Sequence, residues 1–93
     1  MKMRQSNRSR RGPCIFPGYR YCGPNCSGPG APVNAVDAAC KAHDECLQRG
    51  GSPCFCDQQF LNRLRPLINP YTKEGRHAGT IHHAMRIAAR FRC

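Results

Sequence analysis

Three side chains between residues 43 and 57 have the types and spacing that the activation of a water molecule requires. His43 can remove a proton from water, and the adjacent Asp44, about 100° away on a helix, can bind a metal ion instead. Asp57 can orient the imidazole from behind if its helix packs beside that of His43. Together the three residues favour metal-assisted hydrolysis.

A loop rich in glycine and proline precedes the histidine. Residues 21–32 read YCGPNCSGPGAP, a composition that prevents a long helix or strand and leaves backbone carbonyls free. Carbonyls of such a loop and a carboxylate on a nearby helix are the oxygen ligands that calcium takes. The sequence therefore predicts a calcium site between this loop and Asp44.

Two amphipathic helices must position these groups. The first is expected from a cap at Asn34 to Arg49, with an inward stripe of Val36, Ala39, Cys40, His43 and Leu47. The second is expected to begin at Ser52 or Pro53 and to be kinked or ended by Pro66, with a stripe of Phe60, Leu61, Leu64, Leu67 and Ile68. Asp57 projects from this second stripe toward the first helix, so it needs a partner there.

The short turn at Gly50-Gly51 makes the two helices antiparallel neighbours. His43 lies seven residues before Gly50 and Asp57 seven after it, so each sits about 10 Å from the turn and the two side chains can meet. Cys46 and Cys56 are also nearly level and can form a bridge.

A last helix is expected at Ile81–Arg92, capped by Thr80 and preceded by a loop at Asn69–Gly79. Its apolar side holds Ile81, Ala84, Met85, Ile87, Ala88 and Phe91, and its polar side holds His82, His83, Arg86 and Arg90. The apolar side can pack on the core or lie on a lipid surface, and the sequence leaves both interpretations open.

Eight cysteines in 93 residues indicate a small, disulfide-rich, mainly α-helical fold. Four bridges are compatible with about 105 connectivities. Zinc binding by Cys22, Cys26, Cys54, Cys56, His82 and His83 is disfavoured because no paired Cys-x-x-Cys knuckles occur. We expect an extracellular or other oxidising compartment, although neither a signal peptide nor a transmembrane stretch is visible.

The formal net charge of +10 attracts polyanions such as nucleic acid, anionic lipid or acidic carbohydrate. Residues 1–12 contain five of the fifteen basic residues and little to bury, so we expect a disordered arm there and a domain at residues 13–93. The arm is either simply solvated or attracted to a membrane or nucleic acid.

The chain resembles the secreted phospholipase A2 family over roughly residues 19–64. The motifs are the Tyr21-Cys22-Gly23 loop, the helix Asp37-x-x-Cys40-x-x-His43-Asp44-x-Cys46 and the Cys56-Asp57 pair. The resemblance implies two disulfides, Cys22 with Cys40 and Cys46 with Cys56. It also implies calcium-dependent hydrolysis of the sn-2 ester of phospholipids at a membrane surface. The positive charge favours an anionic surface, and we expect a monomer.

Carried over residue by residue, the resemblance makes His43 the base that activates water, and Asp57 the group that fixes His43. Asp44, with the carbonyls of Tyr21, Gly23 and Asn25 (or Cys26), would bind calcium, and the amide of Gly23 would hold the oxyanion.

The chain departs from the common family pattern at several places. Asn25 stands where a glycine is common, and Leu47 stands where many relatives have a tyrosine that donates to the buried aspartate. Tyr19 or Tyr71 is the candidate replacement, unless the network is thinner. The basic arm replaces the amphipathic N-terminal helix of vertebrate forms, so the chain is closer to minimal plant-like or microbial members. The alternative function is a catalytically inactive, basic binding protein, toxin-like or nucleic-acid-binding.

Overall fold

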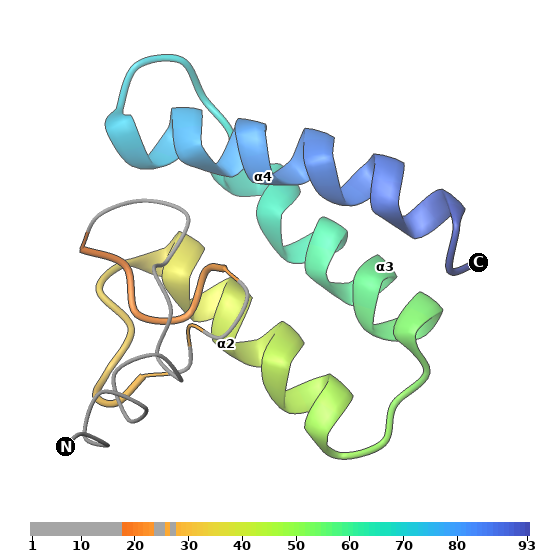
Figure 1. Cartoon of the computed structure of the whole chain (residues 1–93). Helices are drawn as coiled ribbons and strands as arrows, with labels where there is room; N and C mark the ends of the chain where they lie inside the picture. Colours follow the sequence, from red (N-terminus) through yellow and green to blue (C-terminus); the bar gives the residue numbers. More distant parts are fainter. Residues whose placement is uncertain (1–17, 24–25, 27) are drawn as a thin grey trace, which may run out of the picture.

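The computed structural model describes residues 18–23, 26 and 28–93. In this part the chain forms no strand and consists of three α-helices and one short 3-10 helix: α2 (Ala35–Gln48), α3 (Pro53–Leu64), η1 (Arg65–Leu67) and α4 (Lys73–Arg90). Helices α2 and α3 run antiparallel, and α4 packs along the other side of α3 (Figure 1). The expected mainly α-helical fold is confirmed, whereas the arm expected at residues 1–12 lies outside the described residues.

The first two helices begin and end where the sequence predicted. The side chain of Asn34 caps α2 by accepting a hydrogen bond from the Asp37 amide at 2.8 Å, and Gly50 follows the helix with a φ of 87°. Ser52 caps α3 in the same way, with Pro53 in the first turn. The Pro66 ring cannot donate to the helix ladder, so α3 gives way to η1 after Leu64.

The predicted start of the last helix is wrong. Helix α4 begins at Lys73, because the hydroxyl of Thr72 accepts a hydrogen bond from the Gly75 amide at 2.9 Å. Thr80 is not a cap but lies inside the helix, where its hydroxyl donates to the Arg76 carbonyl. Gly75 lies in the first turn of α4, where Asn69 packs so closely against it that a Cβ would clash. A glycine is therefore needed at this position, although it disfavours a helix.

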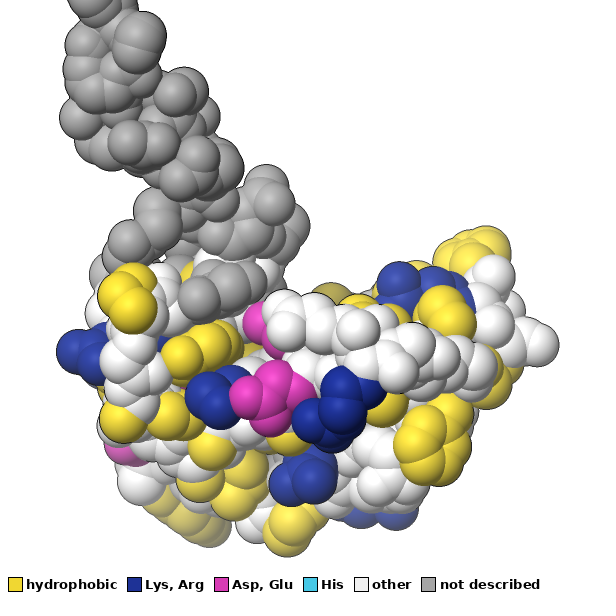
Figure 2. All heavy atoms as spheres, turned by 90° about the horizontal axis from the view of Figure 1, so that it is seen from below, with side chains coloured by type: hydrophobic (Ala, Val, Ile, Leu, Met, Phe, Trp, Pro, Cys, Tyr) yellow, Lys and Arg dark blue, Asp and Glu magenta, His cyan; other side chains and the backbone are white. Residues whose placement is uncertain are grey.

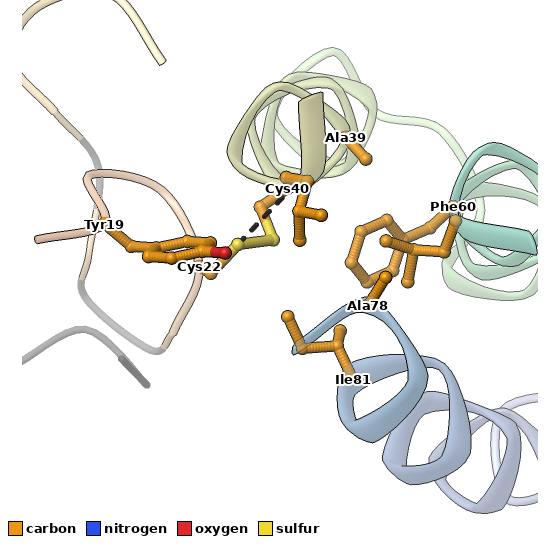
Figure 3. Close-up of a cluster of buried hydrophobic side chains, with 9 residues drawn as sticks. Tyr19, Cys22, Ala39, Cys40, Phe60, Ala78 and Ile81 are labelled. Atoms are coloured by element: carbon orange, nitrogen blue, oxygen red, sulfur yellow. Dashed lines mark hydrogen bonds between the residues drawn. A yellow bond between two sulfur atoms is a disulfide. The ribbon is translucent and has the colours of Figure 1, made fainter. Parts of the chain in front are cut away.

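The core lies where the three helices meet the loop that precedes α2. Figure 3 shows Ala39 and Cys40 of α2, Phe60 of α3, and Ala78 and Ile81 of α4 pointing toward one another, with Tyr19 and Cys22 closing one side. Leu64 and Val36 are also fully buried. The stripe predicted for the second helix is right for Phe60, Leu61 and Leu64, but Ile68 lies beyond η1 and is exposed.

The buried face of α4 also differs from the predicted stripe. Ile81 is buried and Met85 half-buried, but Ile87 is 46% exposed and Phe91 is 84% exposed. The small side chains of Ala78 and Ala89 are buried instead of those of Ile87 and Phe91. Small side chains fit where two helices pack closely. Two large apolar side chains of α4 are therefore left on the surface.

Three disulfides connect the described elements. Cys22–Cys40 and Cys46–Cys56 are the two bridges that the resemblance implied, and Cys54–Cys93 joins the start of α3 to the C-terminal residue. Cys26 is disulfide-bonded as well, so none of the four cysteines of the zinc interpretation is a free thiolate. The bridges, worth about 2–4 kcal/mol each, are consistent with an oxidising environment.

None of the described helices is both long enough and apolar enough to span a bilayer.

Candidate active site

His43 and Asp57 meet across the α2–α3 interface, as their equal distance from the turn predicted. The imidazole Nε2 lies 2.8 Å from Asp57 Oδ1. A carboxylate only accepts, so in the neutral ring Nε2 holds the proton and Nδ1 keeps its lone pair. The ring also stacks on Phe60, with centroids 4.7 Å apart, and its side chain is 11% exposed. His43 is therefore held in one orientation with one nitrogen left to accept a proton.

Asp57 is fully buried and is bonded to a second partner that the sequence did not predict. Arg92 donates from Nε to Oδ2 at 2.8 Å and from Nη2 to Oδ1 at 2.6 Å. Burial alone raises the pKa of Asp57, but the hydrogen bonds from Arg92 and His43 outweigh it and hold the pKa below its usual value. Asp57 is thus an anion whose hydrogen bond holds the His43 imidazole in one orientation.

Neither tyrosine that the sequence suggested donates to Asp57. The hydroxyl of Tyr19 bonds to His77 and Asn34, and Tyr71 is 87% exposed. Arg92 is in place because the Cys54–Cys93 bridge fixes the neighbouring residue against α3. No local pattern in the sequence reveals this contact, because Arg92 lies 35 residues from Asp57.

We expect Arg92→Gln to weaken both the fold and the orientation of His43. The loss of a bidentate partner from a buried carboxylate should lower the free energy of unfolding by about 2 kcal/mol. This is less than the cost of about 3–5 kcal/mol for breaking a fully buried pair, because the Arg92 side chain is 39% exposed. The pKa of Asp57 should rise, and since an acid with a depressed folded pKa stabilises only while ionised, acid unfolding should move to higher pH. Circular dichroism against pH measures this shift.

The matched control is Arg90→Gln, because Arg90 forms no ion pair among the described residues. An acid-unfolding midpoint of Arg92→Gln no higher than that of Arg90→Gln would contradict the role given to Arg92.

A cleft of about 350 Å³ opens beside His43. Its polar lining includes His43, Asp44 and Arg92, and its remaining walls come from Tyr21, Gly23, Cys40, Leu47, Phe60, Ile81 and Met85. Burial raises the pKa of Asp44 to about 6, an effect opposed by His43 and enhanced by Asp37 and Glu45. Among the described residues no Lys or Arg forms an ion pair with Asp44. The cleft thus contains a carboxylate without a cationic partner.

Asp37 holds the loop against α2. Its buried carboxylate accepts hydrogen bonds from the backbone amides of Arg20, Tyr21 and Val33, at 2.8–3.1 Å. The sequence indicated Asp37 only as part of the α2 motif. Its bonds bring Tyr21 and Gly23 to the edge of the cleft.

Asp37→Ala should therefore release the loop. Hydrogen bonds to a charged group are worth about 1.5–3 kcal/mol each, and the loss of three of them, which do not add fully, should cost at least about 3 kcal/mol. Urea unfolding with the disulfides intact measures this cost. The control is Glu74→Ala in the exposed first turn of α4, for which we expect less than about 0.5 kcal/mol. Equal midpoints for the two variants would overturn the role of Asp37.

The residues around the cleft fit calcium by the kind of donors they offer. Asp44 is an unpaired carboxylate, and Tyr21 and Gly23 of the loop line the same cleft. Gly23 has a φ of 131°, a backbone conformation that favours glycine, and its carbonyl accepts one hydrogen bond from the Cys26 amide, which leaves one lone pair. In the described part of the chain no cluster of three His, Cys, Asp or Glu side chains could hold a metal. Asn25 lies outside the described residues.

Comparison with known proteins bears on the resemblance stated from the sequence. Residues 13–50, which include Gly23, His43 and Asp44, match the model of the phospholipase A2-like domain. The resemblance to the phospholipase A2 family is confirmed. Asp57 and Arg92 lie beyond the matched segment.

The curated relatives that the chain matches include viral capsid proteins. Capsid protein VP1 of feline panleukopenia virus and that of canine parvovirus type 2 are each 39% identical over 69 residues, and that of murine minute virus is 36% identical over 69 residues. Each alignment covers 64% of this chain and 9% of the capsid protein, so the chain spans about a tenth of these relatives. No solved structure matches the chain.

Proposed function

We propose that the chain is a calcium-dependent phospholipase A2 that releases a fatty acid and a lysophospholipid by hydrolysis of the sn-2 ester. The observation that supports this most strongly is the hydrogen bond between His43 and buried Asp57 at the edge of a cleft that also contains Asp44. A base, its orienting carboxylate and an unpaired acid converge there.

His43 acts as the general base in this proposal. Its Nδ1 accepts a proton from a water molecule as the water oxygen forms a bond to the ester carbonyl carbon, and the imidazolium then returns the proton to the departing lysophospholipid oxygen. Asp57 keeps the proton on Nε2 and stabilises the imidazolium by its negative charge. Arg92 is a positioning residue, since it contacts Asp57 and acts on the ring only through it.

The loop residues stabilise the negative charge on the ester oxygen. The amide of Gly23 is the donor for this oxyanion, and Asp44 with the carbonyls of Tyr21, Gly23 and Asn25 would hold calcium. When bound, the ion supplies positive charge beside the ester carbonyl. The apolar walls formed by Leu47, Phe60 and Met85 suit an acyl chain beside these polar groups.

The exposed apolar side chains of α4 support action at a lipid surface. Ile87 of α4 and Phe91, the residue that caps its C-terminal end, are four residues apart and both exposed. Arg86 precedes Ile87 in the sequence, and Arg90 precedes Phe91. Apolar side chains that enter the headgroup region and arginines that attract anionic lipid form an interfacial helix. An anionic phospholipid membrane is thus the proposed partner, and no second copy is required.

Phe91→Ala should weaken binding to anionic vesicles. Burial of a phenylalanine is worth about 1.5–3 kcal/mol, so we expect a loss of about tenfold or more in vesicle affinity, with little change in hydrolysis of a dispersed short-chain phospholipid. Vesicle sedimentation measures the first quantity. The control is Tyr71→Ala, equally exposed but in the loop before α4. Equal losses in both variants would count against α4 as the lipid-binding element.

The proposed reaction is tested by the products formed from phospholipid labelled in one acyl chain at a time. With calcium present, label at sn-2 should appear in free fatty acid, and label at sn-1 should stay in the lysophospholipid. Release of both labels, or vesicle binding without release of either, would overturn the proposal. The second result would favour the inactive binding protein.

A further inference from the structure

A second pocket lies between α3 and α4, on a different side of α4 from the cleft. Its volume is about 370 Å³, within the range of about 300–1,000 Å³ usual for small-molecule sites. Its polar lining consists of Gln58, Asn62, Arg65, His82, Arg86 and Arg90, and buried Leu61 and Ala89 form part of its floor. The pocket therefore gathers three guanidinium groups and three neutral donors.

No acidic side chain lies among these arginines. The sequence has five acidic residues, all of them described: Asp37, Asp44, Glu45, Asp57 and Glu74. Asp37 binds the loop, Glu45 pairs with Lys41, Asp57 pairs with Arg92, and none of the five lines the pocket. Figure 2 shows an acidic side chain elsewhere on the surface that lies between Lys or Arg side chains. The acidic side chains of the chain therefore supply no counter-charge to the pocket.

His82 gives a second indication of a missing ligand. Its Nε2 is buried and has no hydrogen-bond partner among the described residues, which is rare for a buried polar atom. Burial and the positive charges of Arg65 and Arg86 lower the pKa of His82, so the local field is positive. A neutral imidazole can still donate one hydrogen bond to an anion.

We infer that this pocket binds a phosphate group, either inorganic phosphate or the phosphomonoester headgroup of an anionic lipid. Arginine pairs with phosphate oxygens through parallel hydrogen bonds, and the amides of Gln58 and Asn62 donate to the same ligand class. The site is separate from the cleft around His43, so it does not depend on hydrolysis.

The test is a titration of the full, disulfide-intact chain with inorganic phosphate and, separately, with short-chain phosphatidic acid, followed by nuclear magnetic resonance. We expect saturable shifts of the His82 imidazole and of the side-chain amides of Gln58 and Asn62 with both ligands. Phosphatidic acid, which has an sn-2 ester, should in addition shift residues of the His43 cleft, so it is titrated without calcium. Arg86→Gln combined with Arg90→Gln should weaken binding at least tenfold, since bonds to a charged group are worth about one power of ten or more each. The control, Arg49→Gln combined with Arg63→Gln, removes the same charge between α2 and α3 and should change affinity less than twofold.

The two ligands distinguish the sources of the phosphate. Binding of both indicates a general phosphate site, and binding of phosphatidic acid alone indicates a headgroup site; either supports the inference. If the two double variants lost affinity equally, the effect would depend on net charge alone, and this result would overturn the inference. Shifts confined to the His43 cleft, or saturable binding of duplex DNA but of neither small phosphate, would overturn it as well.

Discussion

His43→Gln should lower phospholipid hydrolysis by about 10²–10⁴-fold while the chain stays folded and still binds calcium. Glutamine is similar in size and can donate a hydrogen bond to Asp57, but it has no nitrogen that accepts a proton from water. The substitution thus removes the base and keeps its position. Initial rates of fatty acid release at saturating calcium, with circular dichroism of the same samples, measure both effects.

The matched control for this variant is His83→Gln, because His83 is exposed on the outer side of α4. Its rate should stay within about twofold of the natural chain. A folded His43→Gln variant that kept a tenth or more of the rate would show that another group activates the water.

Asp44→Asn should abolish calcium binding and, with it, hydrolysis. Asp44 is the single carboxylate of the proposed site, so we expect the natural chain to bind calcium with a Kd on the order of 10⁻⁴–10⁻³ M, in the range of extracellular sites. An amide has no charge and cannot bind bidentately as an anion. Calorimetric titration should show no saturable binding by the variant, and nanomolar binding by the natural chain would contradict the ligand set.

The control for Asp44→Asn is Glu45→Gln, which removes a neighbouring acid that pairs with Lys41 and should leave calcium affinity within about threefold. Calcium affinity should also depend on pH, because the pKa of Asp44 is raised to about 6 and the protonated acid cannot bind the ion. Affinity should be constant above about pH 7 and fall by about tenfold per unit below pH 6. A flat profile to pH 5 would exclude Asp44 as the ligand.

The parts of the site that depend on local pattern were predictable from the sequence. The turn at Gly50-Gly51 makes two helices antiparallel, so counting residues from it placed His43 level with Asp57 and Cys46 level with Cys56. Caps and proline placed the ends of α2 and α3 because both act within one turn of the chain.

The parts that depend on tertiary packing were not predictable. Gly75 and Gly79 disfavour a helix locally, and only the close approach of the 68–69 segment explains why α4 continues through them. The wide apolar side of α4 did not reveal that Ile87 and Phe91 would face solvent. Arg92 reaches Asp57 across 35 residues of sequence, a contact fixed by a disulfide whose pairing was open.

The most direct test of the proposed function is a continuous record of fatty acid release from anionic phospholipid vesicles by the purified, disulfide-intact chain, with calcium added and then chelated. Release should start on addition of millimolar calcium, stop on chelation and resume when calcium is restored. A chain that binds the vesicles but releases no fatty acid above the protein-free blank, or releases it at the same rate after chelation, would contradict the assignment of a calcium-dependent phospholipase A2.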